Sequence, residues 1–173
     1  MMTVLIADDV FLLRAMLKDI LVKQCGVHPD NIIEAKDGLA ASREYKKSKP
    51  SIVFLDILMP GQNGTDTVKD IIAINPNAHI VMCTASADKA NVRICTLNGA
   101  RDYILKPLNP ERIKKALYKY EHWDEYIKQI TPEGNRARLA AEVAQEASKK
   151  PVDSFASIAA EIKATKAFTR DID

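Results

Sequence analysis

The chain has 173 residues, which is enough for one domain of ordinary size and a remainder of roughly 50 residues. Its composition, 47% hydrophobic and 28% charged, is typical of a globular protein and excludes disorder throughout the chain. The net charge of +2 argues against a broad nucleic-acid or membrane-binding surface, and no apolar run approaches the length of a membrane span.

Short apolar runs alternate with amphipathic stretches as far as about residue 120. In chain order they predict a strand at Thr3–Ala7, a helix at Phe11–Cys25, a strand around Ile32–Ile33, a helix at Asp37–Ser48, a strand at Ser51–Leu55, a helix at Thr65–Asn75, a strand at His79–Cys83, a helix at Asp88–Leu97, a strand at Asp102–Leu105 and a helix that begins at Asn109. Continuous apolar strands are typical of a parallel sheet that is buried on both faces. The pattern therefore predicts an α/β fold, a (βα)5 doubly wound five-stranded sheet.

Polar residues follow four of these five strands. They are Asp8 with Asp9, Asp56, Thr84 and Lys106, whereas the second strand ends unremarkably at Glu34 and Ala35. In open parallel sheets, ligands bind outside the carboxyl ends of the strands. We therefore expect these polar side chains to gather at one rim of the sheet.

The three carboxylates of this rim suit the chemistry of phosphoryl transfer. Two charges about 5 Å apart repel by roughly 3 kcal/mol at an effective dielectric of 20, and Mg²⁺ with its preference for oxygen ligands relieves that repulsion. Asp56 can then act as a nucleophile, with Lys106 as a positive charge and Thr84 as a hydroxyl donor for the phosphoryl oxygens. Each residue alone is more typical of a turn, a helix cap or a solvated surface, so the prediction depends on their joint occurrence at the strand ends.

The spacing of the cysteines indicates a reducing cellular compartment and gives no pattern of a disulfide or zinc site. Cys25, Cys83 and Cys95 are widely spaced and form no CxxC pair, so we expect three buried, reduced thiols. No basic signal region precedes the first strand, and we therefore expect a cytoplasmic protein.

Four motifs spread over residues 1 to about 120 resemble the receiver domain of two-component response regulators, including those of the chemotaxis type. They are DDVFLLR (Asp8–Arg14), FLDILMPGQNG (Phe54–Gly64), CTA (Cys83–Ala85) and YILKP (Tyr103–Pro107). The resemblance implies a flavodoxin-like strand order of 2-1-3-4-5. It also implies a signalling protein, rather than an enzyme with an external substrate, which accepts a phosphoryl group from a histidine kinase or a phosphotransfer protein.

The resemblance assigns roles to residues at the rim. It implies that Asp56 is phosphorylated, that Asp9 binds Mg²⁺ directly and Asp8 through water, and that Asp56 and the backbone carbonyl of Leu58 complete the protein ligands. The side chain of Leu58 is apolar at the approach of the attacking water, so we expect it to slow hydrolysis of the phosphoryl group.

The resemblance also implies a conformational switch. Thr84 is the hydroxyl that moves toward the phosphoryl group, Tyr103 is the aromatic residue that rotates inward behind it, and the Lys106–Pro107 bond is cis. The added negative charge biases a pre-existing equilibrium. We expect the output surface for a downstream protein on the fourth helix, the fifth strand and the fifth helix.

The sequence predicts two segments, a receiver at residues 1–120 and a helical extension at residues 121–173. An apolar seam crosses this boundary at Ile113, Ala116, Tyr120, Trp123, Ile127 and Ile130. The fifth helix either projects and pairs with a second chain, as a homodimer, or the extension folds back on its own receiver. Further along, residues 133–149 and 154–168 have the pattern of two amphipathic helices, which suit dimerisation, docking or partner binding.

Three other classes of protein compete with this interpretation. A DNA-binding transcriptional regulator would use the C-terminal helices, but acidic residues outnumber basic ones there, so nucleic acid is an unlikely partner. A phosphohydrolase with an aspartate nucleophile usually needs a second acid where Leu58 stands. A flavodoxin-like cofactor binder would need a phosphate-binding loop in place of Asp8 and Asp9.

Overall fold

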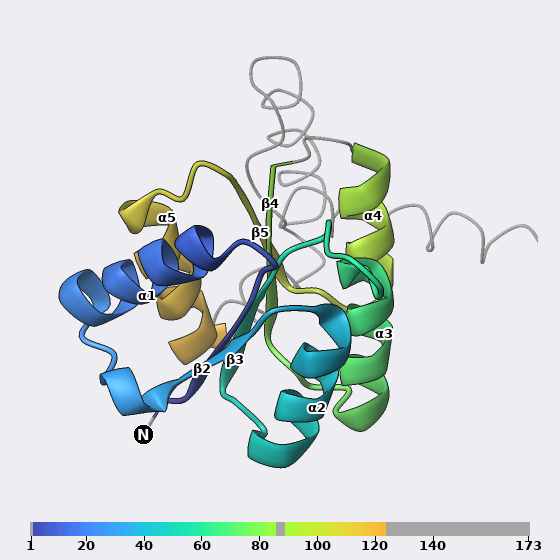
Figure 1. Cartoon of the computed structure of the whole chain (residues 1–173), viewed down its shortest axis with the longest axis horizontal. Helices are drawn as coiled ribbons and strands as arrows, with labels where there is room; N and C mark the ends of the chain where they lie inside the picture. Colours follow the sequence, from blue (N-terminus) through green and yellow to red (C-terminus); the bar gives the residue numbers. More distant parts are fainter. Residues whose placement is uncertain (1, 86–88, 124–173) are drawn as a thin grey trace, which may run out of the picture.

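The computed structural model describes residues 2–85 and 89–123 as a parallel sheet flanked by helices (Figure 1). The elements are β1 (Val4–Ala7), α1 (Phe11–Cys25), the 3-10 helix η1 (Pro29–Asn31), β2 (Ile32–Ala35), α2 (Gly38–Ser48), β3 (Ile52–Leu55), α3 (Gly64–Ile74), β4 (Ile80–Thr84), α4 (Lys89–Leu97), β5 (Asp102–Leu105) and α5 (Pro110–Glu121). None of the described helices is long and apolar enough to cross a membrane. The two amphipathic helices predicted at 133–149 and 154–168 lie outside the described residues.

The sheet has the strand order β2-β1-β3-β4-β5 with every pair parallel, so the predicted fold class and strand order are confirmed. Helices α1 and α5 cover one face, and α2, α3 and α4 cover the other (Figure 1). The central strands β1, β3 and β4 are buried along their whole length, which explains why their sequences are apolar without alternation. Each face of the sheet therefore carries its own hydrophobic core.

Local capping sets where the helices begin and end. The side chains of Asp37, Asn63 and Asn109 accept hydrogen bonds from the first turns of α2, α3 and α5, and Gly26 ends α1 in the left-handed conformation.

The predicted bounds of α1 and β5 are confirmed, and the other strands and helices are shifted by a residue or so. The 3-10 helix η1 was not predicted, because three residues carry no periodic pattern. Burial is confirmed for two of the three cysteines, and it is wrong for Cys25, which is only partly buried at the end of α1.

The last described turns of the chain pack on the α/β domain itself. Ile113 and Ala116 are buried in the core beneath α1, and Tyr120 packs against that core. Trp123 lies against the His79 ring, 5.0 Å between centroids, and beneath the Arg101 guanidinium, 4.6 Å from the ring centre. These contacts favour docking on the same chain for the first four residues of the predicted seam. Ile127 and Ile130 lie outside the described residues.

His79 is buried at the amino end of β4, at the opposite end of the sheet from Asp56. Burial, with the nearby charges of Arg101 and Lys119 adding to it, lowers the pKa of His79 from 6.5 to about 3. Its ring meets Tyr120 and Trp123 edge to face, and neither of its nitrogens has a hydrogen-bond partner among the described residues. The folded protein therefore holds this imidazole neutral.

Acid should destabilise the protein through His79. Because its folded pKa is lowered, the unfolded chain takes up the proton first, and stability is lost as the pH falls from 6.5 toward about 3. The titration of His79 should lower the free energy of unfolding by about 2 kcal/mol at pH 5 relative to pH 7. His79→Phe keeps an aromatic ring that does not titrate. In urea unfolding, the variant should therefore lose about 2 kcal/mol less stability than wild type between pH 7 and pH 5. An equal loss of stability in both proteins would contradict the prediction.

Candidate functional site

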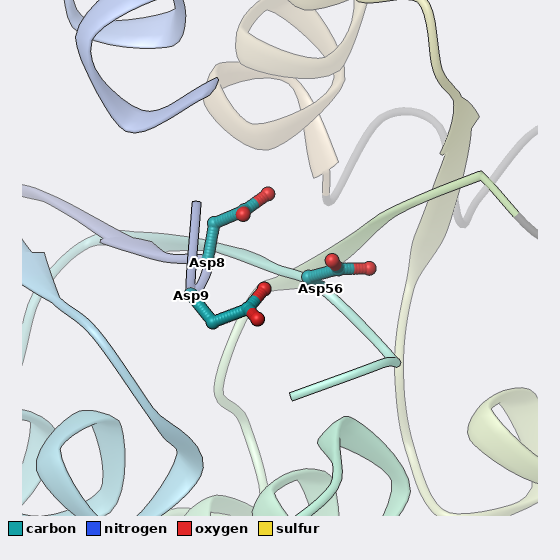
Figure 2. A group of neighbouring side chains, drawn as sticks. All are labelled: Asp8, Asp9 and Asp56. Atoms are coloured by element: carbon teal, nitrogen blue, oxygen red, sulfur yellow. The ribbon is translucent and has the colours of Figure 1, made fainter. Parts of the chain in front are cut away.

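The carboxyl ends of the strands bring the predicted polar residues to one rim of the sheet. Asp8 and Asp9 follow β1, Asp56 follows β3, Thr84 is the last residue of β4, and Lys106 follows β5. Figure 2 shows the three aspartates side by side, two from the β1–α1 loop and one from the end of β3. One carboxylate oxygen from each lies within 4.8 Å of the other two. The gathering of carboxylates predicted from the sequence is therefore present.

Lys106 bridges two of these carboxylates. Its Nζ donates hydrogen bonds to Asp8 Oδ2 at 2.6 Å and to Asp56 Oδ2 at 2.7 Å. All three side chains are nearly buried, whereas Asp9 is exposed at the mouth of the cluster. The lysine thus occupies the space between the carboxylates and offsets part of their repulsion.

Burial and charge shift the ionisation of this group. Burial raises the pKa of Asp56 above its ordinary value and the charge of Asp8 adds to that, while Lys106 opposes both. For Lys106, burial disfavours the ammonium form, but the hydrogen bonds to Asp56 and Asp8 outweigh it, so its pKa is raised. The lysine is therefore a fixed positive charge beside a carboxylate that is poorly solvated.

The aspartate cluster fits a small divalent cation. Converging carboxylate oxygens are the ligands that Mg²⁺ prefers, and their mutual repulsion gives a dication a favourable place. The neighbouring loop holds the backbone of Ile57 and Leu58 close to Asp56, because the Ile57 amide donates to Asp56 Oδ1 at 2.7 Å and the Gly64 amide donates to Ile57 O at 2.8 Å. A Cβ at Gly64 would lie 2.8 Å from Ile57 Cα, so only glycine allows this close approach.

The two predicted switch residues lie on adjacent strands behind the cluster. Thr84 is fully buried at the end of β4, and its carbonyl accepts a hydrogen bond from the Lys106 amide at 2.9 Å. Tyr103, on β5, is turned into the core and is only 3% exposed. The Lys106–Pro107 peptide bond is cis, as the resemblance implies. Leu58 projects outward beside Asp56, with 60% of its surface exposed.

Two further residues belong to this rim and were missed from the sequence. Arg14, on α1, donates from Nη1 to the carbonyl oxygens of Asp8 at 2.8 Å and Asp9 at 3.4 Å. Its Nε lies 3.4 Å from Glu34 Oε2, at the end of β2. The signal was available, because Arg14 closes the DDVFLLR motif and Glu34 occupies the one strand end that looked unremarkable.

Known proteins are similar in sequence to this chain over most of the described domain. The sequence profile of the response regulator receiver domain matches residues 4–118. The chain is 45% identical over 116 residues to the chemotaxis protein CheY of Thermotoga maritima, covering 67% of this chain and 94% of that protein. It is 38% identical over 119 residues to CheY of Listeria monocytogenes, covering 69% and 98%.

Solved structures share the fold. One similar chain comes from the crystal structure of a CheX–CheY–BeF3–Mg²⁺ complex of Borrelia burgdorferi, with a TM-score of 0.63 and 30% identity over 68% of this chain and 87% of that one. The match to the family profile ends at residue 118, close to the end of α5 at Glu121.

Proposed function

This chain belongs to the response regulator receiver domain family, and from that premise we propose that it accepts a phosphoryl group on Asp56 in a Mg²⁺-dependent reaction. Receiver domains of this kind act in phosphorylation-dependent two-component signalling, interact with histidine kinases and downstream targets, and bind Mg²⁺ at an acidic pocket. The observation that carries the proposal is the buried Asp56, held between Lys106 and two further carboxylates at the strand ends.

In the proposed reaction, a carboxylate oxygen of Asp56 attacks the phosphorus of a phosphohistidine. A phosphorus–oxygen bond forms and the phosphorus–nitrogen bond breaks, with its electron pair leaving on the imidazole of the donor. Lys106, which already contacts Asp56, is placed to pair with a phosphoryl oxygen once the acyl phosphate has formed. A Mg²⁺ ion held by Asp8, Asp9, Asp56 and the carbonyl of Leu58 would supply charge neutralisation for the transferring group.

The signal would pass through Thr84 and Tyr103. A phosphoryl group adds about −1.5 to −2 charge at Asp56, and hydroxyl and ammonium donors gain a stronger interaction in that state than in the free one. Thr84 would turn toward the phosphoryl group, and Tyr103, which is already turned into the core, would be held in that inward position behind it. Because Tyr103 lies on β5, the output surface would be formed by α4, β5 and α5, where a downstream protein binds.

The direct test is whether the purified chain takes up one phosphoryl group. With a small phosphodonor and Mg²⁺, intact-mass spectrometry should detect an increase of about 80 Da. The same donor in excess EDTA is the control, and it should label the protein far more slowly. A chain that no donor labels, or that labels equally well in EDTA, would contradict the proposal.

Leu58 should govern how long the phosphoryl group survives. Its exposed side chain stands two residues after Asp56, where it would cover the approach of water, and it offers no group to orient or deprotonate that water. Leu58→Asn should therefore shorten the half-life of the acyl phosphate several-fold, on the order of threefold to tenfold. Decay of the labelled mass after removal of the donor measures this, and an unchanged half-life would contradict it. Leu39→Asn, an exposed substitution on α2, serves as the control.

Several further features of the proposal concern partners. The phosphoryl donor would be a histidine kinase or a phosphotransfer protein, which would approach over Phe11 and Leu12, exposed apolar residues at the start of α1. Residues 121–173 would serve as a dimerisation or partner-binding segment in a cytoplasmic protein. No observation on the described residues favours the alternative of a DNA-binding regulator.

A further inference from the structure

The turn between β1 and α1 carries both Asp8 and Asp9, yet the usual helix-capping device does not hold it. Val10 occupies the N-cap of α1, where it can make no side-chain cap, and the first turn of α1 has no acidic residue. Asp8 supplies one local contact, because its Oδ1 accepts from the Val10 amide at 2.9 Å. The Asp8 amide donates to Ala35 O at 3.2 Å, and the carbonyl oxygens of Asp8 and Asp9 are oriented by a further contact.

Arg14 provides that contact from one turn further along α1. Its Nη1 reaches the carbonyl oxygens of both Asp8 and Asp9, so a single guanidinium fixes two successive peptide groups. The side chain is 13% exposed, and the Phe11 ring lies 5.7 Å from its central carbon. At Asp8 and Asp9 the guanidinium contacts only the backbone oxygens, so it does not pair with either of their carboxylates.

Glu34 forms an ion pair with Arg14 on the other side, and the buried Arg14 Nε makes no hydrogen bond among the described residues. Glu34 lies at the end of β2, which pairs with β1, and its Oε2 is 3.4 Å from Arg14 Nε. Its second oxygen pairs with Lys18 at 2.9 Å. The ion pair thus connects the carboxyl end of β2 to the β1–α1 turn, and all five strands contribute to the rim.

We infer that Arg14 is a positioning residue, held by Glu34, that sets the affinity of the aspartate pair for Mg²⁺. This inference rests on the proposed magnesium site. A ligand turn that is held in its binding conformation pays less ordering entropy when the ion binds, and loss of such supporting contacts typically weakens metal affinity by about tenfold to a hundredfold.

The experiment measures Mg²⁺ affinity calorimetrically on the full chain, with thermal unfolding in EDTA as a check that each variant is folded. Arg14→Ala should weaken Mg²⁺ binding about tenfold, and Glu34→Gln about threefold. The double variant should be no weaker than Arg14→Ala alone, because Glu34 acts through Arg14. Arg14→Lys, which keeps the charge and one donor nitrogen, should recover part of the affinity. Lys18→Ala is the matched control, since it also pairs with Glu34 but touches neither carbonyl, and it should change the affinity less than about twofold.

A purely structural role would lower the unfolding temperature in EDTA and leave the affinity of the folded protein unchanged, which would overturn the inference. An equal loss of affinity in Lys18→Ala would also overturn it, because general electrostatics would then be the cause. If Arg14→Ala does not fold, an unchanged affinity in folded Glu34→Gln overturns it. A wild-type chain that binds no Mg²⁺ would overturn the proposed function as well, whereas normal binding by Arg14→Ala overturns this inference alone.

Discussion

Asp56→Asn should abolish phosphoryl uptake. The amide keeps the size and most of the hydrogen bonds of the carboxylate but has no anionic oxygen to attack phosphorus, so no acyl phosphate forms. Under conditions that label the wild-type chain, the mass increase of about 80 Da should fall below detection in the variant. The variant should still fold, because the Ile57 amide can donate to the amide oxygen at position 56 as it does to the carboxylate.

The matched control is Asp30→Asn, the same change at a side chain that is 90% exposed in η1. Its labelling should equal that of wild type. Undiminished labelling of Asp56→Asn would remove this residue from its proposed role, and peptide mapping of the phosphorylated chain would then locate the true acceptor. Slow residual labelling confined to Asp8 or Asp9 would instead support the site and show that its neighbours can substitute weakly.

The sequence predicted the sheet well because the strands are buried on both faces. Such strands must be apolar throughout, and an unbroken run such as Ile52–Leu55 has few other interpretations in a chain with helical stretches on either side. The end of the domain was harder to predict. Tyr120 and Trp123 continue an apolar seam whose spacing suits a second chain as well as the same chain. The contacts of these two side chains with His79, Arg101 and the core distinguish the possibilities.

The residues that lie directly at the strand ends could be predicted from the sequence. The contacts made by long side chains that reach across the rim could not. That Asp8, Asp9 and Asp56 would converge follows from parallel topology. The bridging position of Lys106 does not follow, because it depends on a long side chain folding back over two carboxylates. The DDVFLLR motif points to Arg14 as a residue of interest, but its contacts with the Asp8 and Asp9 carbonyl oxygens could not be predicted from any residue pattern.

Lys106→Met should produce a second large effect. The variant should be less stable than wild type in EDTA but should bind Mg²⁺ more tightly. In the structure Lys106 neutralises Asp8 and Asp56 from within the cluster, in competition with any cation. Its removal leaves two nearly buried carboxylates facing each other, which should lower the free energy of unfolding in EDTA by about 3 kcal/mol. The same uncompensated charge should bind Mg²⁺ more tightly than the wild-type site does, by about tenfold or more.

These opposing changes separate an electrostatic role from a packing role. If charge is the cause, saturating Mg²⁺ should restore most of the lost stability of Lys106→Met, because ligand binding to the folded state adds stability in proportion to the logarithm of the affinity.

Lys119→Met is the matched control, since Lys119 forms a similarly buried pair with Asp102, 2.8 Å apart and away from the cluster. It should be destabilised to a comparable degree, and Mg²⁺ should rescue it no more than it stabilises wild type. Urea unfolding with and without Mg²⁺ measures all three proteins. An affinity in Lys106→Met equal to or weaker than that of wild type would mean that the lysine does not compete with the cation, and the electrostatic account of the cluster would be wrong.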